Sequence, residues 1–342
     1  MATKRAKKKT TKKRATRKTA RKATRKKTAA QPATSRWKRK LLILLALIVC
    51  ILSGMYYFGS FETRARMEQC ALSAINLPRT SAVTPAPIAA VLDNLHDLLP
   101  SSEGLVVEGG ELGRNDNSFF LAGIPHSRQA VRVLPNPSHS NLFSENSLQA
   151  TCVAIRLDDA TKKKAEADTG IQVDARVAQL TAQALTDAQW QPQPIAPASA
   201  LIRQHGTRGA KDAQLATNHF PMSEALASGV WKKAMHELTQ RYPQRFGEVW
   251  IYLGPVYSNN SLKLASGILV PDAYYAIALD LTNAGGLRAM ALLIPSDAES
   301  KNLNDYLTSI TQIEKQTGLQ FLPELGFSIR DTLGNYVSPS VW

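Results

Sequence analysis

The sequence predicts an α+β globular domain that follows a basic tail and one membrane-spanning helix. Three observations lead to this prediction. The first 40 residues carry 19 of the 42 Lys and Arg side chains and no Asp or Glu. The next 19 residues, 41–59, contain no charged side chain. Beyond them, short apolar runs typical of strands alternate with segments whose apolar residues recur at helical spacing.

The basic tail, residues 1–40, accounts for the positive charge of the whole chain. The formal net charge is +15, yet the residues after position 40 carry 23 basic side chains against 27 acidic ones. Residues 11–27 repeat Lys, Arg, Ala and Thr, with no apolar side chain larger than Ala. Such a segment has nothing to bury, so we expect the tail to be disordered.

Two kinds of polyanion suit the tail, DNA and anionic lipid headgroups. Its composition resembles the Lys-, Ala- and Thr-rich tails of linker histones, and its cations would bind duplex phosphates by counterion release without reading bases. The same cations would each contribute about 1 kcal/mol near an anionic membrane surface. Both partners therefore stay open. The candidate nucleic-acid-binding residues of the tail are Lys12, Lys13, Arg14, Arg17, Lys18, Arg21 and Lys22.

Residues 41–59, LLILLALIVCILSGMYYFG, predict a transmembrane helix. At 1.5 Å rise per residue they reach about 29 Å, close to the ~30 Å hydrocarbon core of a bilayer. Trp37, Tyr56 and Tyr57 flank the span as interfacial aromatic residues do. The basic residues just before the helix place the tail in the cytoplasm and the C-terminal domain on the far side, periplasmic in a two-membrane bacterium. A cleaved signal peptide would have a shorter charged region and a small-residue cleavage site.

The C-terminal part reads as a sheet with helices packed on it. Residues 60–129 suggest a juxtamembrane helix, a Pro-, Ala- and Thr-rich linker and a small extension. Helical patterns run from 222 through Trp231 and Met235, and over 302–318, where Gly318 suits a C-cap. The runs 248–254, 273–281 and 287–294 have few polar residues, so we expect both faces of these three strands to be covered by other parts of the protein. The expected strands are 104–109, 118–123, 130–134, 150–157, 248–254, 273–281 and 287–294.

The three cysteines give no metal-binding pattern. Cys50 lies in the apolar span, which leaves Cys70 and Cys152. A disulfide between these two is compatible with export to an oxidising compartment, and two buried thiols are an equally good reading.

Several ordered motifs in the second half of the chain resemble one known family. They are EVWIYLGPVY at 248–257, ILVPDAYYAIALDL at 268–281 and SITQIEKQTGLQFLPEL at 309–325, with a looser match at 142–157. Together they resemble the DNA/RNA non-specific endonuclease family over 130–325, with a C-terminal tail at 326–342. The resemblance implies a ββα-metal (His-Me) nuclease-like fold with a mixed or antiparallel sheet and packed helices.

The resemblance also implies a catalytic site, and this chain departs from it. In the family a Mg²⁺ is held by an Asn and its water shell, and the His of an Asp-Arg-Gly-His tetrad deprotonates the attacking water. Asn218 and Trp231 keep the family spacing, which puts Ala227 at the metal-binding Asn and Met235 at the supporting Glu. The stretch between the tetrad and Thr217 is about a dozen residues shorter than usual. The residues matching the tetrad are Thr207, Arg208, Gly209 and Ala210.

These substitutions favour a protein without nuclease chemistry. Ala cannot accept a proton, and neither Ala nor Met offers the hard oxygen that Mg²⁺ requires. We therefore expect no intact catalytic residue and no bound metal, and a role in binding or assembly at the cell envelope. The alternative is an active, Mg²⁺-dependent nuclease with a relocated site, in which His205 or His236 substitutes for the base and Arg208 contacts phosphate.

Overall fold

The computed structural model describes residues 119–159, 163–166, 170–281 and 286–342, with scattered positions between 43 and 108. The tail 1–40, including its seven candidate nucleic-acid-binding residues, lies outside the described residues, as does most of 60–118. Most of 41–59 lies outside them too, although Ile43, Leu47 and Ile51 are helical and exposed. Among the helices that are described, none is long and apolar enough to cross a bilayer.

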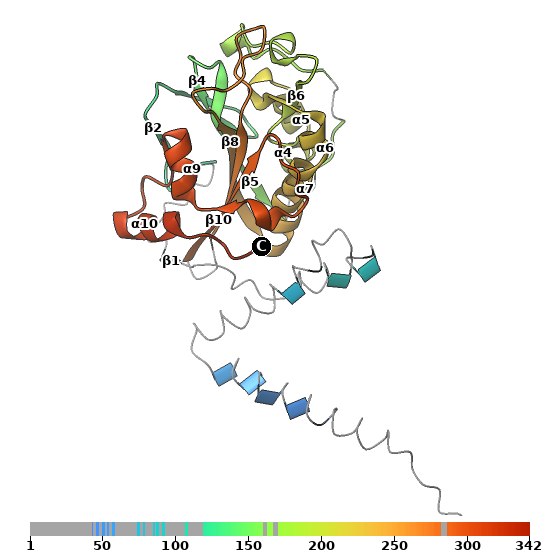
Figure 1. Cartoon of the computed structure of the whole chain (residues 1–342), viewed down its shortest axis with the longest axis vertical. Coiled ribbons are helices and arrows are strands. Elements are labelled where there is room, and N and C mark those ends of the chain that lie inside the picture. Colours follow the sequence, from blue (N-terminus) through green and yellow to red (C-terminus); the bar gives the residue numbers. More distant parts are fainter. Residues whose placement is uncertain are drawn as a thin grey trace, which may run out of the picture. The chain divides into compact units, whose positions relative to one another are not determined.

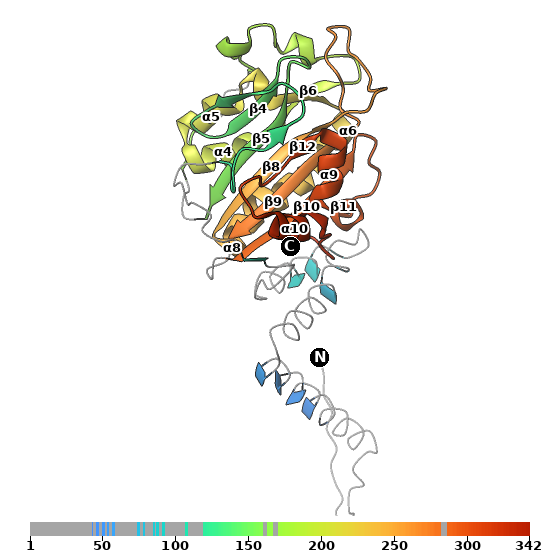
Figure 2. The same ribbon diagram turned by 90° about the vertical axis from the view of Figure 1, so that its left-hand side faces the viewer.

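An antiparallel sheet forms the centre of the described domain (Figures 1 and 2). Its strand order is β1-β10-β9-β8-β5-β4-β3, and β11 pairs with β10. Central strands β5, β8 and β9 are buried on both faces, as expected for nearly continuous apolar runs. The strand bounds are β1 Val107–Glu108, β3 Arg132–Pro135, β4 Ser140–Ser144, β5 Gln149–Asp158, β8 Glu248–Val256, β9 Ala273–Leu281, β10 Gly286–Pro295 and β11 Leu307–Thr308.

Helices cover both faces of this sheet. One face carries the helices between β6 and β8, and the opposite face carries α9 and α10, as Figure 1 shows. Successive side chains of β8 point to opposite faces of the sheet, so the sheet has a hydrophobic core on each face. Ile251 belongs to the core beneath the first group of helices, and Tyr252 to the core beneath α9 and α10. The helix bounds are α4 Ala198–His205, α5 Thr207–Ala213, α6 Glu224–Ser228, α7 Val230–His236, a π-helical turn (η4) Glu237–Arg241, α8 Tyr242–Phe246, α9 Ile310–Thr317 and α10 Phe327–Asn335.

Short elements connect these layers. The 3₁₀ turns are η1 Ala175–Val177, η2 Gln183–Leu185, η3 Ala216–Asn218 and η5 Leu303–Tyr306. Two small antiparallel pairs stand apart from the main sheet. They are β2 His126–Ser127 with β12 Leu319–Gln320, and β6 Gln191–Pro194 with β7 His219–Met222.

The β6–β7 strand pair contains three prolines, and their positions in the pair explain why it tolerates them. Pro192 pairs with Pro221, and Pro194 pairs with His219. In an antiparallel pair, alternate residues turn their N–H and C=O groups toward the partner strand. The prolines occupy the positions whose backbone groups point away from the partner strand, so their missing N–H groups remove no hydrogen bond between the strands. Gln191 and Gln193 occupy the positions that bond across the pair.

The structure corrects two of the expected elements. Residues 119–123 form bends and a turn, not a strand, because the Tyr252 hydroxyl takes the place of a neighbouring strand. It accepts from the Leu121 N–H at 2.6 Å and donates to the Leu121 carbonyl at 3.0 Å. The expected helix 302–318 is divided into η5, β11 and α9, since Ser309 caps a new helix through the Gln312 N–H. Gly318 caps the end of α9 at φ 71°, as expected.

Residues 326–342, expected as a tail, form part of the packed domain. They contain α10 and end in Trp342, which is 1% exposed. The Trp342 ring lies 5.6 Å from Tyr242 and 5.3 Å from Phe246. The guanidinium of Arg288 lies over the rings of Phe246 and Trp342 and forms a buried ion pair with Asp280. Helix α8 is thereby joined to β9 and β10.

Cys152 is a free, fully buried thiol on β5, and Cys70 lies outside the described residues. Burial raises the pKa of Cys152 to about 12, which makes it an unreactive core side chain.

Candidate functional site

A cavity of about 270 Å³ lies at the end of β6, beside the helices α4, α6 and α7. Its lining comes from the end of β6, the start of α4, one side of α6 and α7, and the π-helical turn. The lining residues are Gln193, Pro194, Pro197, Ala198, Ser199, Ala227, Trp231, Lys232, Met235, His236, Thr239 and Gln240.

Three of the residues expected at the site meet in this cavity. Ala227, Trp231 and Met235 are spaced by four residues, which places them on one side of the successive helices α6 and α7. Strands β6 and β7 pair with each other, and helices α6 and α7 follow β7, which gives a ββα order with α4 and α5 inserted between the two strands. Pro194, at the end of the first strand, lines the cavity opposite these helical residues.

The tetrad Thr207–Ala210 does not contribute to this lining. It forms the first turn of α5, with Thr207 and Arg208 exposed and Gly209 and Ala210 buried. Helix α4 approaches α5 so closely that a Cβ at Gly209 would lie 2.0 Å from the Leu201 carbonyl oxygen. Glycine is therefore required there for helix packing, which accounts for the retained Gly without any role in catalysis.

Asn218 has a structural role in the described domain. Its side-chain oxygen accepts from the Ala196 N–H at 3.1 Å, and its side-chain nitrogen donates to the carbonyls of Ala196 and Ala213, both at 3.0 Å. The residue is fully buried. These three bonds fix the segment between β6 and α4 against the start of β7, and so shape one wall of the cavity.

The two histidines expected as substitute bases lie at different places. His236 is exposed and lines the cavity beside Met235. His205 lines a separate, more polar cavity of about 490 Å³ with Phe119, Arg156, Asp158 and Glu248. Burial and the nearby charge of Lys163 lower the pKa of His205, and its Nε2 is buried without a hydrogen-bond partner among the described residues. The two imidazoles therefore do not share a cavity.

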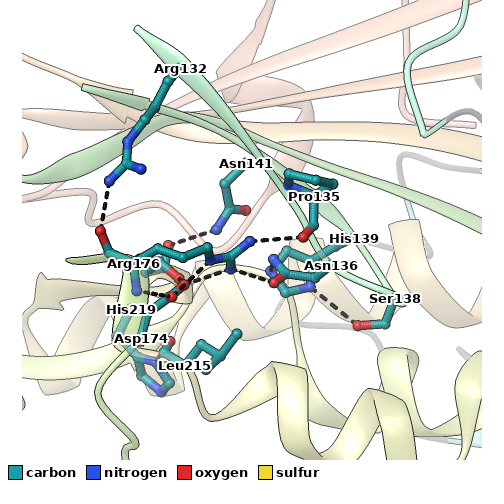
Figure 3. A network of polar contacts seen from close by, with 11 residues as sticks. Arg132, Pro135, Asn136, Ser138, His139, Asn141, Asp174, Arg176, Leu215 and His219 are labelled. Carbon is teal, nitrogen blue, oxygen red and sulfur yellow. Dashed lines mark hydrogen bonds and ion pairs between the residues drawn. The ribbon is translucent and has the colours of Figure 1, made fainter. Parts of the chain in front are cut away.

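A largely buried polar network includes Asn136, which also lines the second cavity (Figure 3). Arg176 contacts Asp174 through two nitrogens at 2.8 and 2.6 Å and donates to the Asn136 side chain at 2.6 Å. Burial by itself would raise the pKa of Asp174, but the bonds from Arg176 more than offset this, and the pKa is lowered. The network joins the β3–β4 turn to η1 and stabilises the fold.

His139 is the fully buried member of this network. Asn136 donates to its Nε2 at 3.1 Å, which leaves Nδ1 protonated and facing the Ser138 hydroxyl at 3.2 Å. Ser138 in turn donates to Asp212 at 2.8 Å. Burial and the nearby Arg176 charge lower the pKa of His139 to about 3, so the ring is neutral at physiological pH. The sequence around 139 did not predict this network, because its charged members Arg176 and Asp212 lie 37 and 73 residues further along the chain.

The first cavity does not fit a magnesium ion. No Asp or Glu is among its described lining residues, and its side-chain oxygens come from amides and hydroxyls. The Thr239 hydroxyl donates to the Met235 carbonyl at 2.6 Å. Across the described residues, no group of three or more His, Cys, Asp or Glu side chains is arranged to hold a metal. The described lining of this cavity therefore offers no carboxylate to a magnesium ion.

Comparison with known proteins gives two matches of different kinds. A family model described as DNA/RNA non-specific endonuclease matches residues 117–326, more than half of the chain. The structure of an EndoG/EndoGI complex, described as showing the mechanism of EndoG inhibition, contains a similar chain with a TM-score of 0.53 and 13% sequence identity. The match covers 61% of this chain and 91% of that one, and at this identity it shows the fold alone. No curated protein sequence matches the chain.

Proposed function

This chain belongs to the DNA/RNA non-specific endonuclease family, and on that premise we propose that it is a catalytically degenerate member acting in binding or assembly at the cell envelope. One observation carries the proposal. The cavity formed by the ββα elements is lined by Pro194, Ala227 and Met235, where a base, a metal ligand and a supporting carboxylate would be needed. None of these three side chains can accept a proton or bind Mg²⁺.

The position of the missing base falls at Pro194 in this proposal, and not at Ala210. Two facts support the change. Pro194 shares a cavity with Ala227 and Met235, whereas Ala210 is buried in α5 away from that lining. Pro194 also lies 16 residues upstream of Ala210, which removes the unusually short interval before Thr217. A general base must come within about 3 Å of the proton that it removes, so a residue that lines the same cavity as Ala227 and Met235 is a better candidate than one outside that cavity.

The N-terminal part of the chain supports a membrane location. We propose that 41–59 anchors the protein as a single-pass helix, with residues 1–40 cytoplasmic and the nuclease-like domain extracytoplasmic. The uncharged length of about 29 Å and the flanking cations support this orientation. The tail would then contact DNA or anionic lipid independently of the domain on the other side.

Incubation of the full-length protein with plasmid DNA and RNA, in the presence of Mg²⁺ or Mn²⁺, tests the central proposal. We expect cleavage no faster than in the protein-free control. Metal-dependent cleavage that is lost in His236→Ala or His205→Ala would overturn the proposal and establish a relocated site. The exposed His126, which lines neither the first cavity nor the His205 cavity, supplies a matched control as His126→Ala.

A separate measurement tests the tail. Protein lacking residues 2–36 is reconstituted into vesicles of neutral or anionic lipid, and binding of duplex DNA is measured over a range of salt. If about eight cations of the tail engage phosphates, the slope of log affinity against log salt is about −7 and disappears on deletion. Unchanged DNA binding after deletion would exclude the tail as a DNA-binding arm.

A further inference from the structure

The β3–β4 turn, residues 136–139, is attached to the rest of the domain mainly by hydrogen bonds. The two hydrophobic cores include Leu134 before the turn and Leu142 after it, and they contain no residue of the turn itself. The turn is bonded instead to Arg176 of η1 and to Asp212 of α5. Separation of the turn from η1 and α5 would therefore leave both cores in place.

The hydrogen bonds through the turn run in one direction, from a guanidinium to a carboxylate. Arg176 donates to the Asn136 side-chain oxygen at 2.6 Å, so the Asn136 amide nitrogen faces His139 Nε2 at 3.1 Å as a donor (Figure 3). Nε2 is therefore an acceptor, and the proton of the neutral ring is on Nδ1, which faces the Ser138 hydroxyl at 3.2 Å. That hydroxyl donates to Asp212 at 2.8 Å, and so it accepts from the ring.

This arrangement has no place for a second proton on His139. A protonated Nε2 would point its N–H at the Asn136 amide nitrogen, which is also a donor. Rotation of the amide would turn its oxygen to the ring, but it would also turn its nitrogen to the guanidinium of Arg176, which can only donate. Either orientation of the amide leaves two donors facing each other in a buried site, where an unpaired polar group is most costly.

The charged groups around His139 come from three other elements. Arg176 of η1 and His205 at the end of α4 both oppose a positive charge on the ring. Asp174, which precedes η1, favours that charge, but its carboxylate is already bonded to two nitrogens of Arg176. Asp212 of α5 lies beyond the Ser138 hydroxyl. Burial and the charge of Arg176 lower the pKa of His139 to about 3, so the ring is neutral in the closed turn.

From this geometry we propose that the β3–β4 turn is an acid-sensitive switch, in which protonation of His139 releases residues 136–139 from η1 and α5 while the central sheet stays folded. Because Asn136 and Pro137 line the second cavity, the release also opens one wall of that cavity. The switch does not depend on the first cavity or on the degenerate function proposed for it. An extracytoplasmic domain, as proposed above, would be exposed to changes in the pH of its surroundings.

The size of the effect follows from where the proton binds. In the released turn His139 has its ordinary pKa near 6.5, so falling pH favours the released state from about pH 6.5 downward. Between about pH 7.5 and pH 5 the ratio of released to closed turn should rise about 30-fold. The pKa of Asp174 is lowered from its usual value, so this carboxylate stays ionised in that range and does not produce the rise.

Hydrogen–deuterium exchange of the full-length protein in lipid nanodiscs, followed by mass spectrometry, tests the switch. The peptide that contains Ser138 reports on the release, because the Ser138 N–H donates to Asp212 at 3.0 Å. After correction for the intrinsic effect of pH on exchange, we expect its opening constant to rise about 30-fold between about pH 7.5 and pH 5. Peptides from β8 and β9 should remain protected over the same time. A flat profile, or exchange of β8 and β9 in step with the turn, would overturn the proposal.

Two glutamine variants identify the histidine that takes up the proton. The Gln side chain has one acceptor and one donor group, so His139→Gln keeps a neutral network and should change by less than about threefold between the two pH values. His205→Gln is the matched control, because it removes the other histidine near the turn, and it should retain the rise of the wild type. Loss of the pH dependence in His205→Gln, with its retention in His139→Gln, would refute the switch.

Asp212→Asn supplies an independent variant if circular dichroism shows that His139→Gln does not fold. It keeps an oxygen for Ser138 but removes the charge, so the turn should open more at both pH values and keep its pH dependence. A flat profile in this folded variant would contradict the assignment to His139. In the wild type, the opening constant should change by about tenfold per pH unit below pH 6, which corresponds to one proton. A change of about a hundredfold per unit would require a second titrating group and would overturn the assignment to His139 alone.

Discussion

Restoring three side chains to the first cavity tests where the chemistry of the family would lie in this fold. The variant Pro194→His/Ala227→Asn/Met235→Glu places an imidazole, an amide and a carboxylate around one cavity. The matched variant Ala210→His/Ala227→Asn/Met235→Glu carries the same amide and carboxylate, but its imidazole lies on α5. Only the position of the base differs between the two proteins.

The expected stabilisation by metal and the expected gain in cleavage rate follow from the positions of these residues. Both variants gain the metal ligands, so both should be stabilised by Mn²⁺, by about 2.7 kcal/mol at a hundredfold excess over Kd. For a domain of this size that corresponds to a rise in Tm of roughly 5–11 °C. A general base contributes about 10²–10⁴-fold when it is within hydrogen-bond reach. Position 210 is outside the cavity, so only the variant with His at 194 should gain this factor.

Thermal unfolding with and without Mn²⁺ measures metal binding, and relaxation of supercoiled plasmid measures cleavage. Met235 is 5% exposed, so the new carboxylate is destabilising without metal, and near-UV circular dichroism should confirm that each variant is folded. Cleavage by the variant with His at 210 that equals or exceeds that of the other would refute the assignment of Pro194. Absence of Mn²⁺ stabilisation in both would show that Ala227 and Met235 do not mark a metal position.

Three further predictions concern stability, each measured by urea unfolding. Arg288→Met leaves Asp280 buried without its partner and should cost about 3–5 kcal/mol, whereas adding Asp280→Leu should recover most of the loss; equal stability of the single and double variants would contradict this. His139 has its pKa lowered to about 3, below the unfolded value near 6.5, so the unfolded state takes up a proton first and stability falls as pH drops from about 6.5 toward 3. At pH 5 the loss is about 2 kcal/mol, and His139→Gln should flatten this slope; an unchanged slope would exclude the buried neutral ring as its source. Trp342→Ala should cost about 3–5 kcal/mol, whereas Val337→Ala, at a side chain that is 49% exposed, should change stability by no more than about 0.5 kcal/mol; a similar small effect at both positions would show that Trp342 does not contribute to the core.

The central sheet could be predicted from the sequence because its strands are buried on both faces. The runs 150–157, 248–254, 273–281 and 287–294 coincide with β5, β8, β9 and β10 to within two residues. Such runs leave little ambiguity, since each is long, apolar and rich in strand-forming residues. The family and the antiparallel sheet are confirmed together by the matching residues 117–326 and by the strand pairing.

Elements that depend on distant contacts could not be predicted in the same way. Residues 119–123 are as apolar as a strand, but a single hydroxyl from Tyr252 binds their backbone. Strand β6 could not be predicted because two of its four residues are prolines. Proline argues against a strand unless its nitrogen faces away from the partner strand, and the sequence alone does not show this. Pro194, the position that we propose for the missing base, belongs to this strand. The short interval between Ala210 and Thr217 is the sequence feature that favours a position further upstream.

The prolines of β6 also affect how the molecule behaves among copies of itself. The edge of β6 that faces away from β7 presents the carbonyls of Pro192 and Pro194 but no N–H group from either residue. A second copy that approached with the same edge would offer acceptors to acceptors, and no ladder could form. An exposed strand edge is ordinarily a starting point for aggregation, and proline is one of the residues that block it. Substitutions that introduce an N–H at 192 or 194, including Pro194→His, would therefore open this edge to strand addition.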